Sequence, residues 1–300
     1  PYTRWTQKES GNPVHPSDSL KAVRSKTSKN KMKARPADPS VSGSPWTTTT
    51  RSAAPIVKKL SGRSPYRDCA HVGVCTWLDG VYWLTFLEAQ PTGTWLMENM
   101  SGSKKKKPVT QRVASLEKDH VYPLLRAKDI SKWHTETSLH LLMVQDPKTK
   151  QGLSTTDLMR LCPKTYEYLK RYERELRDRS GYKKHFEESG APFYSMFDVT
   201  QDTFKPWKVT FRNMGNRIEA AVISQDSGKL VMPQHTVTMI CLDSEREANY
   251  VAGMVNSSPF QYMAFSTGAA GSKSFGGPGM LEYVNIPKYV PSDPDHQVLI

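Results

Sequence analysis

The chain has 300 residues, a net charge of +13 and 37% hydrophobic residues, enough to bury one large core or two small ones. It has no run of roughly 20 apolar residues, the length of a membrane-spanning helix, and no signal-peptide core. Because it begins at Pro1 rather than Met, we expect a fragment of a larger protein. Four irregularly spaced cysteines are typical of a reduced, cytoplasmic protein: Cys69, Cys75, Cys162 and Cys241.

Positive charge is concentrated near the start of the chain. Residues 1–65 hold 13 Lys and Arg against three Asp and Glu, whereas residues 66–300 hold 29 against 26. Residues 1–43 are rich in Ser, Pro, Lys and Asn and lack aliphatic periodicity, which predicts a disordered basic arm or linker. Such an arm attracts polyanions, because each phosphate contact releases counterions; the alternative is a solvated segment that only keeps the chain soluble. Residues 44–300 are expected to form one folded domain.

The first half of this domain is expected to be rich in strands. Residues 72–77 and 81–86 are predicted strands on either side of Asp79-Gly80, a strong hairpin signal. Residues 101–107 are too polar for a core and predict an exposed basic loop. Further strands are predicted at residues 121–125 and 139–144.

From Pro163 the pattern changes to a helical period. Tyr166, Leu169, Tyr172 and Leu176 share one face of a predicted helix. Pro163 suits its first turn, and Gly181 is expected to cap its end.

The rest of the chain mixes strands with one clear helix. Strands are predicted at residues 207–211, 218–224, 236–242 and 283–286. Ser244-Glu-Arg-Glu247 matches a capping box that opens a helix towards Asn256. Without regular βαβ alternation, the fold class is α+β (mixed α/β), with a sheet-rich domain and a few helices.

Cys69, His71 and Cys75 are the one group that suggests a metal. Zinc sites usually need a fourth ligand and closely paired cysteines, which the remaining cysteines do not supply. Ordinary packing is therefore favoured, and we predict no metal site.

Several motifs occur together in one order from about residue 44 to the end. Two of them carry most of the signal: Tyr122-Pro-Leu-Leu-Arg126 with Asp129-Ile130, and Pro163-x-x-Tyr166 running on to Leu176-x-x-Arg179. The others are Gly62-x-Ser64-x-Tyr66, Gly73-Val-x-Thr76, Gly80-Val-Tyr-Trp83, Pro206-Trp-Lys208-x-x-x-Arg212, Pro233-x-His235 and Asn256-Ser257. The ordered set resembles the TaqI-like specificity domain of adenine-N6 DNA methyltransferases.

The resemblance implies sequence-specific recognition of double-stranded DNA for an enzyme of a restriction-modification or phage-defence system. A separate upstream methyltransferase domain would use S-adenosylmethionine. The family's catalytic motif has two prolines before an aromatic residue, and Ser44-Pro45-Trp46, Ser64-Pro65-Tyr66 and Ser258-Pro259-Phe260 each lack one. We therefore predict no catalytic or cofactor-binding residues in this chain. The alternatives are a free-standing DNA- or protein-binding domain and, less favoured, a complete small enzyme.

The expected DNA contacts are mostly basic side chains. Arg126, Lys128 and Lys132 suit phosphates, and Trp133 suits stacking or wedging. Arg212 suits guanine, although it also fits a structural ion pair. Asp129 fits a structural pair with a neighbouring basic residue. The full set is Lys104, Lys105, Lys106, Lys107, Arg126, Lys128, Lys132, Trp133, Lys208, Arg212, His235 and Lys273.

Overall fold

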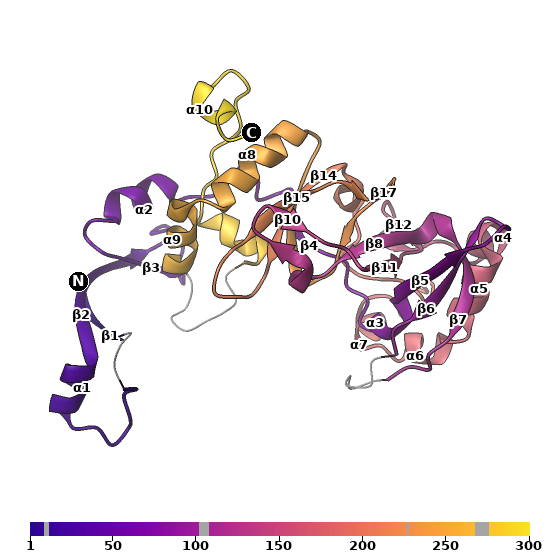
Figure 1. Cartoon of the computed structure of the whole chain (residues 1–300), viewed down its shortest axis with the longest axis horizontal. Helices are drawn as coiled ribbons and strands as arrows, with labels where there is room; N and C mark the ends of the chain where they lie inside the picture. Colours follow the sequence, from indigo (N-terminus) through magenta and orange to yellow (C-terminus); the bar gives the residue numbers. More distant parts are fainter. Residues whose placement is uncertain (9–11, 102–107, 227, 268–275) are drawn as a thin grey trace.

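A computed structural model describes residues 1–8, 12–101, 108–226, 228–267 and 276–300. The fold is α+β, as the sequence predicts, with three larger sheets and helices packed against them. Figure 1 shows an elongated molecule with a six-stranded sheet at one end, a four-stranded sheet in the middle and the N-terminal sheet at the other end. Among the described residues, no helix combines the length and apolar character needed to cross a membrane.

The six-stranded lobe has the order β18-β8-β11-β5-β6-β7, and its pairs are antiparallel except β18 with β8. Leu84, Met97 and Leu116 from the sheet pack against Tyr168 and Leu169 from the helices. The strands are β5 (Trp83–Ala89), β6 (Thr94–Asn99), β7 (Val113–Glu117), β8 (Val121–Leu125), β11 (Leu139–Leu142) and β18 (Met232–Pro233). The helices are α3 (Asp79–Tyr82), α4 (Thr155–Leu161), α5 (Pro163–Lys170), α6 (Glu173–Arg177) and α7 (Ser180–His185).

The four-stranded lobe has the order β15-β14-β19-β4 and a second core. Val209 and Phe211 from the sheet pack with Val251, Phe260 and Met263 from two helices. The strands are β4 (Ala70–Val72), β14 (Trp207–Arg212), β15 (Ala220–Ile223) and β19 (Val237–Leu242). The helices are α2 (Ala54–Leu60), α8 (Glu245–Val255), α9 (Ser258–Thr267) and α10 (Pro294–Gln297).

The N-terminal sheet consists of β1 (Tyr2–Gln7), β2 (Thr27–Pro36) and β3 (Trp46–Thr49), with α1 (Leu20–Lys26) between the first two strands. The disorder expected for residues 1–43 is therefore not confirmed. Met32 is buried on one side of this sheet, beside α9. The segment gains an apolar contact from a helix more than two hundred residues away, which its own composition does not reveal.

The chain passes between the two lobes four times, from β4 to α3, from α7 to β14, from β15 to β18 and from β18 to β19, and a small apolar cluster lies where they meet. Leu125 of β8 and Ile130, which follows it, meet Val231 and Val237 on either side of β18, together with Ile223 of β15. β18 pairs with β8 of one lobe, and the chain enters β19 of the other four residues later. The junction is thus packed rather than a simple linker.

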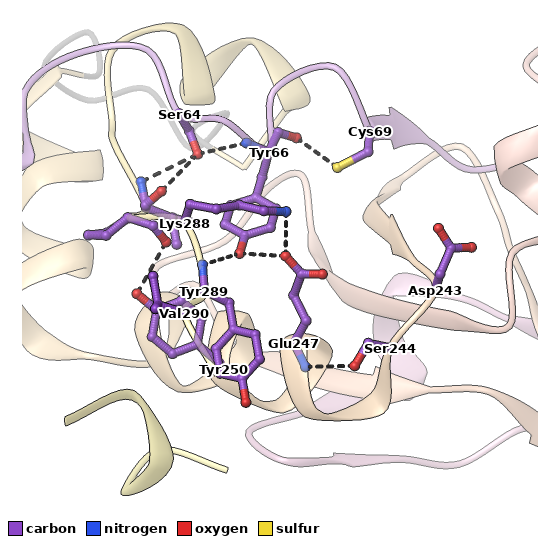
Figure 2. A network of polar contacts seen from close by, with 12 residues as sticks. Ser64, Tyr66, Cys69, Asp243, Ser244, Glu247, Tyr250, Lys288, Tyr289 and Val290 are labelled. Atoms are coloured by element: carbon purple, nitrogen blue, oxygen red, sulfur yellow. Dashed lines mark hydrogen bonds and ion pairs between the residues drawn. The ribbon is translucent and has the colours of Figure 1, made fainter. Parts of the chain in front are cut away.

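A polar network fixes the C-terminal segment to α8 (Figure 2). The Tyr66 hydroxyl donates to Glu247 Oε1 at 2.9 Å and accepts from the Tyr289 amide at 2.9 Å. Lys288 Nζ lies 2.5 Å from the same carboxylate oxygen and 4.8 Å from the centre of the Tyr66 ring. Burial raises the pKa of Tyr66, so its hydroxyl remains a proton donor.

The predicted capping box is half formed. Ser244 Oγ accepts from the Glu247 amide at 3.4 Å, and α8 ends at Val255, just before Asn256 as expected. The Glu247 carboxylate is instead bonded to Tyr66 and Lys288.

The hairpin expected at Asp79-Gly80 is wrong. These residues begin α3, and β4 pairs with β19 while β5 pairs with β6 and β11. A two-residue hairpin of the predicted type needs a positive φ at its second central residue, and Gly80 does not have one. Thr76 Oγ1 donates to Asp79 Oδ1 at 2.6 Å and favours the helical turn instead.

The helix predicted from Pro163 is divided into α5, α6 and α7. Leu169, Tyr172 and Leu176 are buried as expected, but Gly181 lies inside α7 against Trp77 and does not cap a helix. At the break between α6 and α7 the backbone of Arg179 is extended, and its buried guanidinium donates to the carbonyl oxygens of Leu176, Thr76, Phe193 and Ser195.

The short strand expected at residues 283–286 is also absent as such. The structure has a 3₁₀ turn at Pro278–Glu282 and a single bridge between Ser61 and Val284.

Candidate nucleic-acid interface

A short hairpin follows β8 at the junction of the lobes. The chain leaves the sheet through a 3₁₀ turn (Ala127–Asp129) and then forms β9 (Ile130–Ser131) and β10 (His134–Thr135). Lys132 and Trp133 are the two residues of its tip. A two-stranded ribbon of this kind is one of the elements that the major groove of DNA admits.

Arg126 sets the direction in which this hairpin leaves the sheet. Its guanidinium binds Asp129 through two bonds of 2.6 and 2.9 Å and donates to Ser138 Oγ at 2.7 Å. Asp129 also accepts from the Arg126 amide at 3.0 Å. Only 8% of Arg126 is exposed, so it acts here as a clamp on the turn. Asp129 therefore pairs with a neighbouring basic residue, as the sequence suggested.

The hairpin tip presents an aromatic ring and positive charge to solvent. Trp133 is 58% exposed, and Lys132 Nζ lies 5.4 Å from its ring centre. Trp133 has a φ of 72°, in the left-handed region that bulky residues rarely adopt. A large exposed apolar ring in a costly backbone conformation points to a role outside the core.

Hydrogen bonds from the four-stranded lobe hold the hairpin in place. The Trp133 amide donates to the Ala220 carbonyl of β15 at 3.0 Å. Asn256, at the end of α8, accepts from the Ala220 amide at 2.9 Å and donates to its carbonyl at 2.8 Å. Arg212 Nη2 donates to the Ile130 carbonyl at 2.7 Å. The hairpin is thus attached to the second core at two points, to β15 through Trp133 and to β14 through Ile130.

A polar hollow of about 360 Å³ lies beside the hairpin. The exposed Lys128 lines it, and so do His134 of β10 and Glu136 of the loop between β10 and β11. Among the described residues, neither Lys128 nor Lys132 forms an ion pair. Both charges are therefore available to an anion in solution. The remaining lining residues are Arg126, Asp129, Ile130, Ser131 and Ser138.

Arg212 and Lys208 are placed less favourably for DNA contact. Arg212 Nη2 bonds to Glu219 at 2.8 Å as well as to Ile130, which matches the structural ion pair left open above. Lys208 is completely buried, its Nζ donates to the Lys205 carbonyl at 2.8 Å, and burial lowers its pKa to about 8. The prediction of Lys208 as a DNA contact fails because β14 is an inner strand with both faces covered.

The remaining predicted contacts are dispersed or not described. His235 is exposed at the crossing between β18 and β19, where its carbonyl accepts from Asn213. Lys104, Lys105, Lys106, Lys107 and Lys273 lie outside the described residues.

Sequence reasoning missed the exposed His134 of the hairpin, the exposed Arg217 near its docking strand in the sequence, and the supporting role of the buried Asn256. His134 is exposed beside Trp133, and Arg217 is exposed on the loop between β14 and β15, three residues before Ala220. Asn256 was expected to mark a helix end, whereas it also carries the strand on which the hairpin docks. The signal for Asn256 was present in the Asn-Ser motif, but its partner is 36 residues away.

The three candidate metal ligands of the sequence serve other contacts. His71 Nε2 lies 2.9 Å from Asp202 Oδ2, the Cys69 thiol donates to the Tyr66 carbonyl, and Cys75 pairs through its backbone with Phe197. Within the described ranges, no group of three or more His, Cys, Asp and Glu side chains is arranged to hold a metal ion.

Comparison with known proteins gives one relative and one similar structure of interest. The chain is 24% identical over 146 residues to the Type II methyltransferase M.NspV of Nostoc sp., which covers 49% of this chain and 29% of that protein. The Type IIL restriction-modification enzyme MmeI, solved in complex with DNA, aligns with a TM-score of 0.41 and 11% identity, covering 77% of this chain and 24% of MmeI. No family model matches the chain. It thus spans under a third of the methyltransferase that it resembles.

Proposed function

We propose that this chain recognises double-stranded DNA sequence-specifically for an adenine-N6 methyltransferase of a restriction-modification or phage-defence system. The observation that carries the proposal is the hairpin tip at the lobe junction, where an exposed Trp133 stands beside unpaired lysines on a backbone fixed from both sides. The similarity of half the chain to a Type II methyltransferase supports the enzymatic context.

In this proposal the hairpin enters a groove of the duplex. Lys128 and Lys132 neutralise phosphates on either side, and Trp133 stacks or wedges at a base step. His134 and the polar hollow behind it offer hydrogen-bonding groups to base edges. Methyl transfer, with S-adenosylmethionine, belongs to a separate domain of the same enzyme.

The test is selection of preferred duplexes from a random pool by the full chain at moderate salt. We expect enrichment of a short motif that contains adenine, and loss of that enrichment in the Trp133→Ala chain. Salt-sensitive binding without any enriched motif would rule out sequence-specific recognition. An enriched motif without adenine would rule out adenine as the target base while keeping the recognition role.

A further inference from the structure

The N-terminal sheet has two different faces. On β2, Met32 and Asn30 point to the side that α9 approaches, where a hollow of about 340 Å³ is lined also by Arg4, Tyr262 and Phe265. Successive residues of a strand alternate between faces. Lys29, Lys31 and Lys33 therefore share the opposite face, and all three are exposed.

An exposed aromatic ring lies on the same face as the three lysines. Trp5 of β1 is directly opposite Lys29 in the antiparallel register, and side chains of such a pair project to one side of the sheet. Lys29 Nζ lies 4.4 Å from the Trp5 ring centre, and Trp5 is 39% exposed. The lysines follow at steps of roughly 6.8 Å along the strand. We name Trp5, Lys29, Lys31 and Lys33 the basic face.

The described chain supplies no counter-charge to this face. The carboxylates in the described part of residues 1–43 belong to Asp18 and Asp38, which bond to Lys26 and to Ser40. None of the three lysines forms an ion pair with a described residue. Like charges at this spacing repel each other, so the row is costly unless an external anion neutralises it.

Protection of a sheet edge does not explain the lysines. Exposed lysines often guard edge strands against pairing with other chains. β2, however, is the middle strand of the order β1-β2-β3 and pairs on both sides. A membrane surface is also a poor fit, because such surfaces insert aliphatic and aromatic side chains, and Trp5 is the one large apolar residue of the basic face.

We propose that the basic face binds the phosphate backbone of the duplex that flanks the recognised site. This inference rests on the proposed function, because it assigns the face to a second stretch of the same DNA. A linear row of cations suits the regularly spaced phosphates of one strand, and such contacts are independent of base sequence. The N-terminal sheet lies at the far end of the four-stranded lobe from the six-stranded sheet (Figure 1), so it lengthens the molecule's DNA-binding footprint.

The test compares the full chain with a K29Q/K31Q/K33Q variant. The control is K148Q/K164Q/K184Q, which removes the same charge from exposed lysines of the six-stranded lobe that form no ion pair with a described residue. Affinity is measured for a short duplex with the selected motif alone and for a longer one with flanking sequence, over a range of salt. Circular dichroism checks that each variant is folded.

We expect the longer duplex to bind the wild type and the control more tightly than the short one, and the K29Q/K31Q/K33Q variant to lose that difference. For the long duplex, the slope of log affinity against log salt should become shallower by up to about 3, near 0.9 for each lost phosphate contact. Equal behaviour of the variant and the control overturns the inference. Loss of binding to anionic vesicles with unchanged DNA binding would assign the face to a membrane and also overturn it.

Failure of the proposed function has a different signature. In that case no chain prefers the motif over scrambled sequence in the short duplex, whereas the salt slope of the long duplex still reports on the basic face.

Discussion

Trp133 combines large exposure with a fixed backbone. Replacing it with Ala removes the ring but leaves the hydrogen bond from the backbone amide of residue 133 to the Ala220 carbonyl, so the hairpin should keep its place. Aromatic stacking on a base is worth about 1–3 kcal/mol. We expect Trp133→Ala to weaken binding of the selected duplex by a factor between about 5 and 150 while the free energy of unfolding changes little.

Trp46→Ala is the matched control for this substitution, since Trp46 is 60% exposed on the side of the N-terminal sheet away from the basic face. Fluorescence anisotropy gives the affinities and urea unfolding gives the stabilities. Equal affinity of the Trp133→Ala chain and the wild type would remove Trp133 from the DNA interface.

The buried Lys208 lowers the free energy of unfolding by an amount that depends on pH. Burial lowers its pKa to about 8 from the ordinary 10.5, so between these values the unfolded chain binds a proton that the folded protein has lost. The contribution of Lys208 to the free energy of unfolding therefore rises with pH across this window and is constant and unfavourable below it. The full difference is roughly 3 kcal/mol.

Lys208→Met should be more stable than the wild type at neutral pH, and the gain should disappear as the pH approaches 10.5. Urea unfolding at a series of pH values measures this difference, and taking the difference cancels the titration of other groups. Lys184→Met, at an exposed position, is the control for the change from lysine to methionine. A constant difference for Lys208→Met from pH 7 to 10.5 would contradict the lowered pKa.

At the scale of elements, the hairpin of β9 and β10 depends on structure far away in the sequence. Its two strands share only two residue pairs, too few for the hairpin to be stable alone. Its order comes from the Arg126 clamp on one side and from β15 on the other. Asn256 completes this support by bonding to both backbone groups of Ala220.

Asn256→Ala leaves the buried Ala220 amide without a partner, which costs about 1–3 kcal/mol of the free energy of unfolding. Because Ala220 also holds the Trp133 amide, we expect weaker binding of the selected duplex as well. Ser257→Ala is the neighbouring control: its hydroxyl donates to the Met254 carbonyl and accepts from the Phe260 amide at the start of α9, without a bond to Ala220. It should therefore cost some stability, as the loss of a helix cap does, but leave DNA binding unchanged. Calorimetry and anisotropy measure the pair of effects, and wild-type values for Asn256→Ala would refute the supporting role.

At the scale of the whole molecule, the two lobes meet closely where β4 leads into the six-stranded lobe. A Cβ on Gly73 would lie 2.2 Å from the Pro233 carbonyl oxygen and 2.5 Å from that of Gln234. Both are backbone atoms of the segment that runs from β18 to β19, so neither can move without that segment. The junction can therefore pack only around a residue without a side chain at this position.

Gly73→Ala should lower the free energy of unfolding by about 2–4 kcal/mol, because the backbone at residue 73 must move away from that of Pro233 and Gln234. Gly253→Ala, inside α8, is the control, since its Cβ would lie at an ordinary contact distance of 3.5 Å from Leu299. A helical Gly-to-Ala change stabilises by up to about 1 kcal/mol. Thermal unfolding compares the two, and equal stability of both variants would show that the junction is loose.

Local patterns predicted elements well where one periodicity was unambiguous. The strand at residues 121–125 and the start of β14 at Trp207 were placed correctly, and α8 begins after Ser244 as predicted. Asp79-Gly80 failed because the dipeptide fits a hairpin and a helical turn equally, and a local bond from Thr76 favours the turn.

The candidate site was only partly predictable for the same reason. The basic and aromatic residues at 128–133 could be read from the sequence, and Lys128, Lys132 and Trp133 are exposed at one place. Arg126 and Lys208 are basic as well, but neither is open to DNA. Arg126 is paired with Asp129, and Lys208 is buried in a central strand. Charge is visible in a sequence, whereas its accessibility depends on which elements cover it.

By itself the sequence determined the fold class, single elements such as the strands near 121–125, 207–211 and 236–242 and the helix after Ser244, and the basic character of the first 65 residues. These follow from composition and from periods of two and 3.6 residues. Only the tertiary structure decided that Lys29, Lys31 and Lys33 form one open face and that Trp133 is held by a strand 87 residues later. The physical reason is that exposure and hydrogen-bond partners are set by contacts between distant segments, which local pattern does not encode.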